Sequence, residues 1–184
     1  MLAVALVHYP TVNKEGRVVT TSVTNFDIHD IARASRTFGV DRYFIVTPVE
    51  LQQQFTRRIL RYWREGQGAV YNPTRGQALA DVEVVGDLAE AADVLERDWG
   101  APPVWVATSA RRYPNTLTCP ELRARLETGN EHFCLVFGTG WGLHPQVIDE
   151  ADFILEPING PGDWNHLSVR SAVSIYLDRL RGRP

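Results

Sequence analysis

Six short runs of apolar residues recur along the chain with the length and composition of strands. Most are four to six residues long and rich in Val, Leu, Ile and Phe, which is typical of strands that are buried on both faces. They extend over Leu2 to Val7, Tyr43 to Val46, Val82 to Val85, Val104 to Ala107, Phe133 to Phe137 and Phe153 to Leu155.

Segments with helical spacing of apolar and polar residues lie between most of these runs. They extend over Ile28 to Phe38, Val49 to Glu65, Leu88 to Trp99, Pro120 to Thr128 and Leu167 to Leu180. We expect Asn25 or Asp27 to cap the first helix and Asn165 to cap the last. The alternation predicts an α/β fold with a six-stranded, mainly parallel sheet and helices on both faces.

Two long connections interrupt this rhythm, Tyr9 to Thr24 and Gly66 to Asp81. Each contains Pro, Gly and Asn and exceeds the usual length of a connection between strand and helix, which is typical of functional lids. There is no internal repeat and no linker rich in Gly and Ser. We therefore interpret residues 1–184 as a single domain.

The charge of the chain is distributed unusually. The net charge of −3 argues against a general nucleic-acid coat, but Lys14 is the single lysine, so 18 of the 19 basic residues are arginines. Arg57, Arg58, Arg61 and Arg64 fall within one expected helix. Arginine suits bidentate contacts to phosphate. Two interpretations stay open for each of them, contact with RNA and a solvated surface with ion pairs.

Cysteine content and hydropathy exclude several classes of protein. Cys119 and Cys134 are the only cysteines and no histidine lies at ligand spacing, so we expect neither a disulfide framework nor a metal site. We expect Cys134 to be a buried strand residue. No apolar run approaches the ~18 residues that a membrane helix needs. A cytoplasmic location without membrane contact is expected.

Two loops that offer mainly backbone groups follow neighbouring apolar runs. They are Gly138-Thr139-Gly140-Trp141-Gly142 and Glu156-Pro157-Ile158-Asn159-Gly160. Glycine lets the main chain approach a ligand closely, and ligands bind at the carboxyl ends of strands in open α/β sheets. These loops predict a small-molecule pocket.

Two common nucleotide sites are not indicated. A dinucleotide fingerprint needs glycines after the first strand, where this chain has His8-Tyr9-Pro10. A P-loop needs Gly-Lys-Ser or Gly-Lys-Thr, and Lys14 is not in such a pattern.

Three segments together resemble the motifs of the SPOUT methyltransferases of the SpoU/TrmH-like kind, a trefoil-knotted family that methylates RNA. Thr24 to Val40 resembles the first motif, Phe137 to Leu143 the second, and Ile154 to Val173 the third. They occur in the family's order and span most of the chain. The resemblance implies a deep C-terminal trefoil knot, bound S-adenosyl-L-methionine and a homodimer in which the partner completes the pocket.

The resemblance also implies where the cofactor binds, because the family holds it with three loops and the start of the last helix. The implied cofactor-binding residues are Thr108, Ser109, Ala110, Phe137, Gly138, Thr139, Gly140, Gly142, Glu156, Pro157, Ile158, Gly160, Leu167 and Ser168. Gly140 stands where the family's second motif has an acidic residue, and Trp164 and His166 stand where Ser and Asn are common in the third. Both departures lie where the family contacts its substrate, so the resemblance does not name the target nucleotide.

Arg33 matches the arginine of the first motif, which in the ribose-methylating branch lies next to the attacking hydroxyl. A guanidinium is protonated at any ordinary pH, so orienting a phosphate or polarising the nucleophile suits it better than removing a proton. The alternative is a local ion pair with Asp27 or Asp30.

His29 lies one helical turn before Arg33, and its imidazole could accept a proton during transfer. His166 is a second candidate for this role, and for both the alternative is a structural histidine. Asn25 and Asp163 are weaker polar candidates.

The resulting hypothesis is an S-adenosylmethionine-dependent methyltransferase that acts on tRNA or rRNA, at a base nitrogen or a ribose 2′-hydroxyl. The alternative is a knotted module that binds the cofactor without catalysis and serves as an RNA-associated or ribosome-associated factor.

Overall fold

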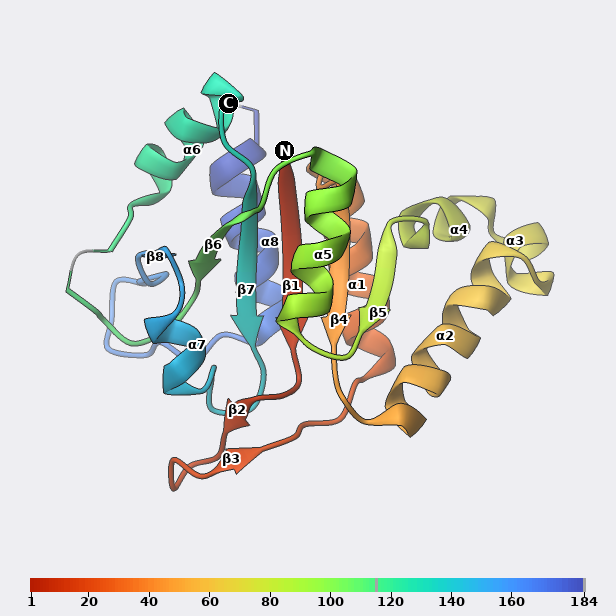
Figure 1. The fold of residues 1–184 in the computed structure, drawn as a ribbon, viewed down its shortest axis with the longest axis horizontal. Helices are drawn as coiled ribbons and strands as arrows, with labels where there is room; N and C mark the ends of the chain where they lie inside the picture. Colours follow the sequence, from red (N-terminus) through yellow and green to blue (C-terminus); the bar gives the residue numbers. More distant parts are fainter. Residues whose placement is uncertain (115, 184) are drawn as a thin grey trace.

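A six-stranded sheet forms the centre of the molecule (Figure 1). The computed structural model describes residues 1–114 and 116–183, and the strand order is β5-β4-β1-β7-β6-β8. Neighbouring strands are parallel throughout. The strands are β1 Leu2–Val7, β4 Arg42–Val46, β5 Val82–Val85, β6 Val104–Ala107, β7 Phe133–Gly138 and β8 Phe153–Ile154. The prediction of a six-stranded parallel α/β sheet is confirmed.

Helices cover both faces of this sheet. Side chains of a strand alternate between faces, so β1 directs Leu2, Val4 and Leu6 into one core and Ala3, Ala5 and Val7 into the other. The first core is closed by α1 Asn25–Thr37, α2 Glu50–Arg64, α4 Pro73–Leu79, α6 Cys119–Thr128 and α8 Val169–Arg181. The second is closed by α5 Leu88–Trp99 and α7 Pro145–Asp149, on the near side in Figure 1.

The long connections are more regular than expected. The first contains a hairpin of two antiparallel strands, β2 Thr11–Val12 and β3 Val18–Val19. The second contains α3 Gln67–Tyr71 and α4, and the helix α7 was not predicted either. These helices are short, so tertiary packing rather than local propensity stabilises them.

Two predicted helix caps are wrong. Thr24 caps α1 through a capping box: its Oγ1 accepts the N–H of Asp27 at 3.2 Å, and Asp27 Oδ2 accepts the N–H of Thr24 at 3.1 Å. Asn25 and Asp27 therefore lie inside the helix. Ser168 caps α8 by accepting the N–H of Ser171 at 3.3 Å, whereas Asn165 donates to Ala110 O in the neighbouring loop at 2.9 Å.

In the described residues, no helix combines the length and apolar character needed to cross a bilayer. In the same residues, no group of three or more His, Cys, Asp or Glu side chains could hold a metal ion. Cys119 and Cys134 are buried and unbonded to each other, as expected for Cys134 in β7.

Candidate functional site

A cavity of about 820 Å³ opens beside the carboxyl ends of β6 and β7. Loops from four parts of the chain and the first turns of α8 form its walls. The lining residues are Thr21, Ser22, Thr24 and Asp27; Thr108, Ser109, Ala110 and Arg111; Phe137 to Gly142; and Ile158, Asp163, Asn165 to Val169, Ala172 and Tyr176. The volume is in the range of pockets that hold small molecules.

The glycine-rich turn after β7 forms one wall and is fixed by backbone hydrogen bonds. Thr139 N donates to Val7 O at 3.3 Å, and Trp141 N donates to Val12 O at 3.1 Å. A Cβ at position 138 would lie 2.5 Å from the backbone N of Leu143, so only glycine permits this close fold of the turn. Gly140 has φ +61°, a conformation that other residues rarely adopt.

A chain of polar side chains supports the turn from beneath. The fully buried His8 lies at the end of β1, and its Nδ1 is 3.0 Å from Thr21 Oγ1. Thr21 Oγ1 in turn contacts the hydroxyl of Thr139, which donates to Val7 O at 3.0 Å. Burial lowers the pKa of His8 to about 4, with a smaller opposing effect of Asp27. His8 is therefore neutral at physiological pH.

The loop after β8 is held at its start by polar contacts. Glu156 Oε1 accepts the N–H of Cys119 at 2.9 Å, and Glu156 O accepts the hydroxyl of Tyr176 at 2.6 Å. Pro157 is buried and Gly160 is exposed. Of the four residues of this loop that were predicted to bind the cofactor, Ile158 lines the cavity, and Glu156, Pro157 and Gly160 do not.

The other predicted cofactor-binding residues are brought together at this cavity. Thr108, Ser109 and Ala110 follow β6, Leu167 and Ser168 precede α8, and Phe137, Gly138, Thr139, Gly140 and Gly142 belong to the turn.

Few charged groups line the cavity. Asp27 is buried, and its Oδ1 lies 3.8 Å from Arg170 Nε, while Asp163 and Arg111 are exposed. His166 is also exposed at the wall, with its ring in edge contact with Trp164 at a centroid distance of 5.1 Å.

Of the four predicted catalytic residues, His166 is the one that lines this cavity. Asn25 is an exposed residue in the first turn of α1. His29 is half-buried and its ring meets the edge of Trp63 at 5.7 Å. Burial lowers the pKa of His29, and the charges of Arg75 and Arg33 lower it further.

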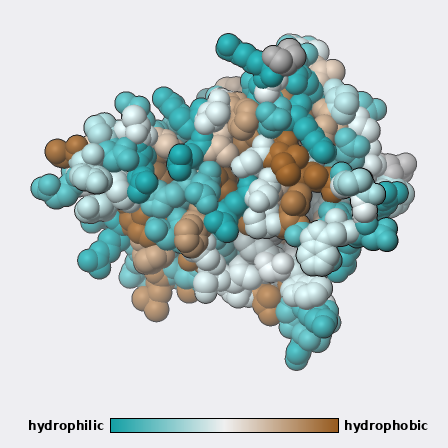
Figure 2. Space-filling model, turned by 180° about the vertical axis from the view of Figure 1, so that it is seen from behind, coloured by the Kyte–Doolittle hydropathy of each residue, from teal (hydrophilic) through white to brown (hydrophobic). Residues whose placement is uncertain are grey.

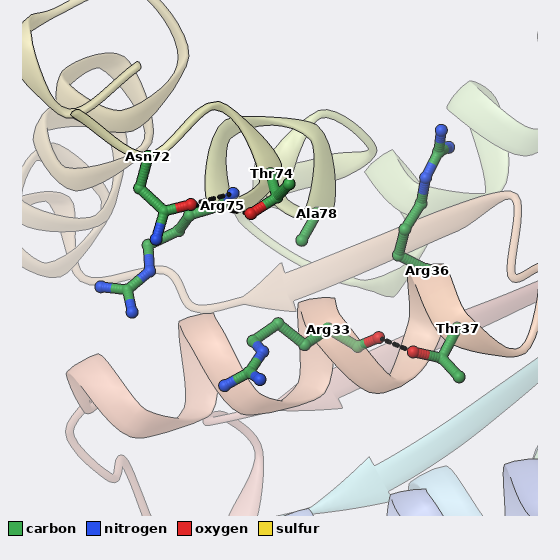
Figure 3. A pocket seen from close by; sticks show the side chains of 7 residues that line it. All are labelled: Arg33, Arg36, Thr37, Asn72, Thr74, Arg75 and Ala78. Carbon is green, nitrogen blue, oxygen red and sulfur yellow. Dashed lines mark hydrogen bonds between the residues drawn. The ribbon is translucent and has the colours of Figure 1, made fainter. Parts of the chain in front are cut away.

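Arg33 lines a second, smaller hollow of about 380 Å³ between α1 and α4 (Figure 3). It does not form the local ion pair considered above. Asp30 Oδ2 instead accepts from Arg170 Nη1 at 3.0 Å, and Asp27 Oδ1 lies 3.8 Å from Nε of the same arginine.

The arginines of α2 have different roles. Arg64 donates through Nε and Nη2 to the carbonyls of Leu79, Ala80 and Val82, which joins the end of α4 to β5. Arg57 Nη2 donates to Val84 O at 3.2 Å. Arg58 and Arg61 are exposed. Two of the four arginines therefore satisfy backbone carbonyls, which weakens the interpretation of α2 as a continuous RNA-binding face.

Several lining residues were not predicted from the sequence. Thr21 and Ser22 come from a long connection, and no pattern indicated that it would reach the glycine-rich turn. Tyr176 was interpreted only as part of the apolar face of the last helix. A tyrosine on the apolar face of a helix does indicate a polar group nearby, since a buried tyrosine hydroxyl needs a hydrogen-bond partner.

The chain is similar to known proteins over nearly its whole length. A family model described as SAM-dependent RNA methyltransferase matches residues 1–182. An uncharacterized protein from Aquifex aeolicus is 43% identical over 180 residues, covering 98% of this chain and 88% of that protein. A tRNA (guanine-N(1)-)-methyltransferase from Oleidesulfovibrio alaskensis is 45% identical over 178 residues, covering 97% of this chain but 41% of that protein. The chain thus spans less than half of this second relative.

Solved structures share the fold. A probable methylase family protein from Haemophilus influenzae superimposes with a TM-score of 0.64 at 18% identity, covering 98% of this chain and 64% of the other. An AdoMet-bound rRNA methyltransferase from Sinorhizobium meliloti gives a TM-score of 0.55 at 17% identity, covering 98% and 55%.

Proposed function

Because the chain belongs to the family of SAM-dependent RNA methyltransferases, we propose that the 820 Å³ cavity holds S-adenosyl-L-methionine next to an RNA substrate. The observation that carries this assignment is the convergence of the glycine-rich turn, the loop after β6 and the start of α8 on one cavity. Bound there, the cofactor would supply an activated methyl group on sulfur. Most of the rate would come from positioning, since a correctly aligned nucleophile needs little further help.

The walls suit an adenosyl ligand because they offer unused backbone groups. Within the described residues, the N–H groups of Ser109, Gly140 and Leu167 have no acceptor in the protein. These N–H groups face the cavity as donors, and the acceptor nitrogens on a purine edge can bind them. Glycine at position 140 lets the turn pack closely against Thr21 and Val12, because a Cβ there would lie 3.2 Å from Thr21 Cγ2 and 3.3 Å from Val12 O, so a larger residue would displace this wall.

The charged groups also suit this ligand. The cofactor carries a sulfonium, an ammonium and a carboxylate. Asp27 and Asp163 can face the cations, and Arg111 can pair with the carboxylate. We propose that Glu156 and Pro157 position the loop that brings Ile158 to the cavity. Gly160 is exposed to solvent and does not line the cavity.

His166 is the proposed proton acceptor. A nucleophile such as a ribose hydroxyl or guanine N1 must lose a proton on methylation, and an acceptor has to reach it. His166 lies at the cavity wall and is exposed, whereas His29 faces Trp63. His29 and Asn25 do not line the cavity, so we do not expect either to contact the methyl group of S-adenosylmethionine bound in the same subunit.

The proposed substrate is tRNA or rRNA. The relative named a tRNA (guanine-N(1)-)-methyltransferase favours tRNA. More than half of that protein lies outside the match, so its guanine N1 chemistry can belong to the other part. An RNA substrate would agree with the cytoplasmic location expected from the sequence.

We also propose that the C-terminal part is knotted, as the resemblance implies. Backbone contacts between the segment before α6 and the end of β8 support this proposal. Leu117 N donates to Ile154 O at 2.8 Å, and Glu156 N donates to Leu117 O at 2.9 Å. Asn165 then contacts Ala110 on the same segment. The chain after β8 therefore runs closely against the segment between β6 and α6 before it enters α8.

A homodimer is the proposed assembly. Apolar patches interrupt the polar surface on the side that carries α1 and α8 (Figure 2). Phe26 in α1 is 65% exposed and lies under the Arg170 guanidinium from α8, and Leu167, which lines the cavity before α8, is 46% exposed. A partner that covers these side chains would complete the site. Sedimentation velocity would test this, since a monomer at micromolar concentration would contradict it.

The function is tested by incubating the protein with tritium-labelled S-adenosylmethionine and separate fractions of tRNA and rRNA that lack its modification. We expect label in one RNA fraction and less label with His166→Ala. Binding of the cofactor without any transfer would favour a non-catalytic module.

A further inference from the structure

We propose that the hollow between α1 and α4 binds phosphate groups of a single-stranded part of the RNA, with Arg33 and Arg75 as the anion ligands. We call it the α1–α4 groove; it is lined by Arg33, Arg36, Thr37, Asn72, Thr74, Arg75 and Ala78. This inference rests on the proposed function, because it assumes that RNA is the substrate.

The geometry brings two cations to one space. Arg33 projects from α1, Arg75 projects from α4, and their guanidinium groups extend toward the same end of the groove in Figure 3. Guanidinium groups bind phosphate oxygens through paired N–H donors. None of the residues that line the groove belongs to the set that lines the larger cavity, so the two sites are separate.

The positive charges of Arg33 and Arg75 are not compensated by acidic residues of the groove. None of its lining residues is acidic. Within the described residues Arg33 and Arg75 form no salt bridge, whereas Arg36 pairs with Asp81 at 3.3 Å. Two like charges that share a solvent-filled groove repel each other, and a bound phosphate would replace that repulsion with attraction.

The Asn72 side chain beside the arginines is oriented to donate hydrogen bonds. Asn72 Oδ1 accepts the N–H of Arg75 at 3.1 Å and the hydroxyl of Thr74 at 2.8 Å. These contacts use the acceptor of the amide and leave its NH₂ group to donate. Thr37 already donates its hydroxyl to Arg33 O at 2.8 Å. The hydroxyls of Thr74 and Thr37 use their protons in these contacts, so the donors left for an anion are the NH₂ group of Asn72 and the guanidinium groups.

The Arg75 side chain packs against the ring of Trp63. The Arg75 guanidinium lies 4.6 Å from the centre of the Trp63 ring, which restricts its orientation. Trp63 is in turn clamped by two glycines: a Cβ at position 68 would lie 2.6 Å from Trp63 Cε3, and one at position 76 would lie 2.7 Å from Trp63 O. A fixed guanidinium loses less conformational entropy on binding than a mobile one.

Exposed aromatic side chains nearby favour RNA over an isolated phosphate. Tyr71, next to Asn72, is 86% exposed, and Tyr62, next to Trp63, is 49% exposed. Proteins that bind single strands combine a basic groove for the backbone with aromatic rings on which bases stack. Here the α1–α4 groove would bind the backbone, and Tyr62 in α2 and Tyr71 in α3 would stack on bases.

The test is fluorescence anisotropy with a fluorescein-labelled single-stranded RNA at several salt concentrations. The double variant Arg33→Ala/Arg75→Ala should bind about tenfold more weakly at low salt. Its salt slope should fall by about 1.4, because each phosphate contact on a single strand contributes about 0.7. The control Arg97→Ala/Arg183→Ala removes the same charge from exposed positions outside the groove and should leave affinity nearly unchanged.

A second variant avoids loss of packing around Trp63. Asn72→Asp keeps the oxygen that accepts from Arg75 N and Thr74 but replaces the NH₂ donor with negative charge, so it should also weaken RNA binding. Adenosine 5′-monophosphate should not displace the RNA, since it offers one phosphate. Displacement by this mononucleotide would indicate a nucleotide site and would overturn the proposal.

The results separate this proposal from the proposed function. Equal affinity of wild type and both groove variants, or equal loss in groove and control variants, would overturn the groove as a site. If methyl transfer to RNA persisted with that result, the proposed function would stand without it. No RNA binding by the wild type would overturn both. Titration with S-adenosylmethionine should give the same affinity for wild type and groove variants, which confirms that the variants are folded.

Discussion

The imidazole Nδ1 of His8 lies 3.0 Å from the hydroxyl oxygen of Thr21, at the end of β1 and directly beneath the glycine-rich turn. Through Thr21 the contact extends to Thr139, so a fully buried side chain of the central sheet supports a wall of the cavity. Its Nε2 has no hydrogen-bond partner among the described residues, so charging this ring would place an unpaired cation in the core.

We therefore expect His8 to make folding sensitive to acid. Its pKa falls from about 6.5 to about 4 on folding because burial disfavours the charged form. The unfolded chain then binds the proton more tightly, so stability is complete above pH 6.5 and decreases as the pH drops toward 4. Between pH 7 and 4.5 the loss attributable to His8 is about 2.5 kcal/mol.

Urea unfolding of wild type and His8→Asn at both pH values measures this difference. The variant should be less stable at pH 7 but should lose about 2.5 kcal/mol less than wild type on acidification. Parallel losses in the two proteins would contradict the assignment.

Arg64→Ala should lower the free energy of unfolding by about 2–4 kcal/mol. The change leaves the carbonyls of Leu79, Ala80 and Val82 without their common donor, and hydrogen bonds to a charged group are costly to lose. Arg58→Ala is the control on the same helix and should stay within about 0.5 kcal/mol of wild type. Urea unfolding compares them, and similar effects of both changes would exclude the structural role of Arg64.

Tyr176→Phe should weaken binding of S-adenosylmethionine about five- to thirtyfold. The phenol holds the loop after β8 through its bond to Glu156 O, and its loss leaves that carbonyl unsatisfied at a cost of about 1–2 kcal/mol. Tyr62→Phe removes an exposed hydroxyl and should change nothing. Calorimetric titration of both variants is the measurement. Wild-type affinity for Tyr176→Phe would show that this contact does not position the loop.

Neither cysteine should react readily in the native protein. Burial raises the pKa of the Cys119 thiol to about 11 and that of Cys134 further, so little thiolate exists at pH 8. Mass spectrometry after brief iodoacetamide treatment should find both unmodified, and methyl transfer should be unaffected. Rapid alkylation of either one would contradict the burial that the fold assigns to it.

The sequence predicted the sheet well because a strand buried on both faces is apolar at every position. In β1 each residue from Leu2 to Val7 is fully buried, so the run itself was the signal. The helices α3 and α4 were missed because each is short and contains glycine. Gly68 and Gly76 are explained by their close contacts with Trp63, which lies in α2. A local sequence pattern does not predict contacts between separate segments.

The candidate site was predicted unevenly for a similar reason. The glycine-rich turn and the start of α8 carry recognisable motifs, and both line the cavity. His8 and Thr21 carry none, because their role depends on the folding of the β2–β3 hairpin against the turn. Arg33 and His29 lie in the same motif as the cavity residues Thr24 and Asp27, but Arg33 faces α4 and His29 faces Trp63. Their orientation depends on how the second long connection packs against α1, which the motif does not encode.

We expect the cavity beside the glycine-rich turn to bind S-adenosylmethionine. Calorimetric titration of wild type, Gly140→Val and Gly129→Val tests it most directly. Both glycines have positive φ, but a Cβ at position 129 meets nothing within 4 Å and lies at the end of α6, while one at position 140 meets Thr21 at the cavity wall. We predict that wild type and Gly129→Val bind the cofactor and that Gly140→Val, folded by circular dichroism, does not. Unchanged binding by Gly140→Val, or no binding by the wild type, would show that the cofactor does not bind at this turn.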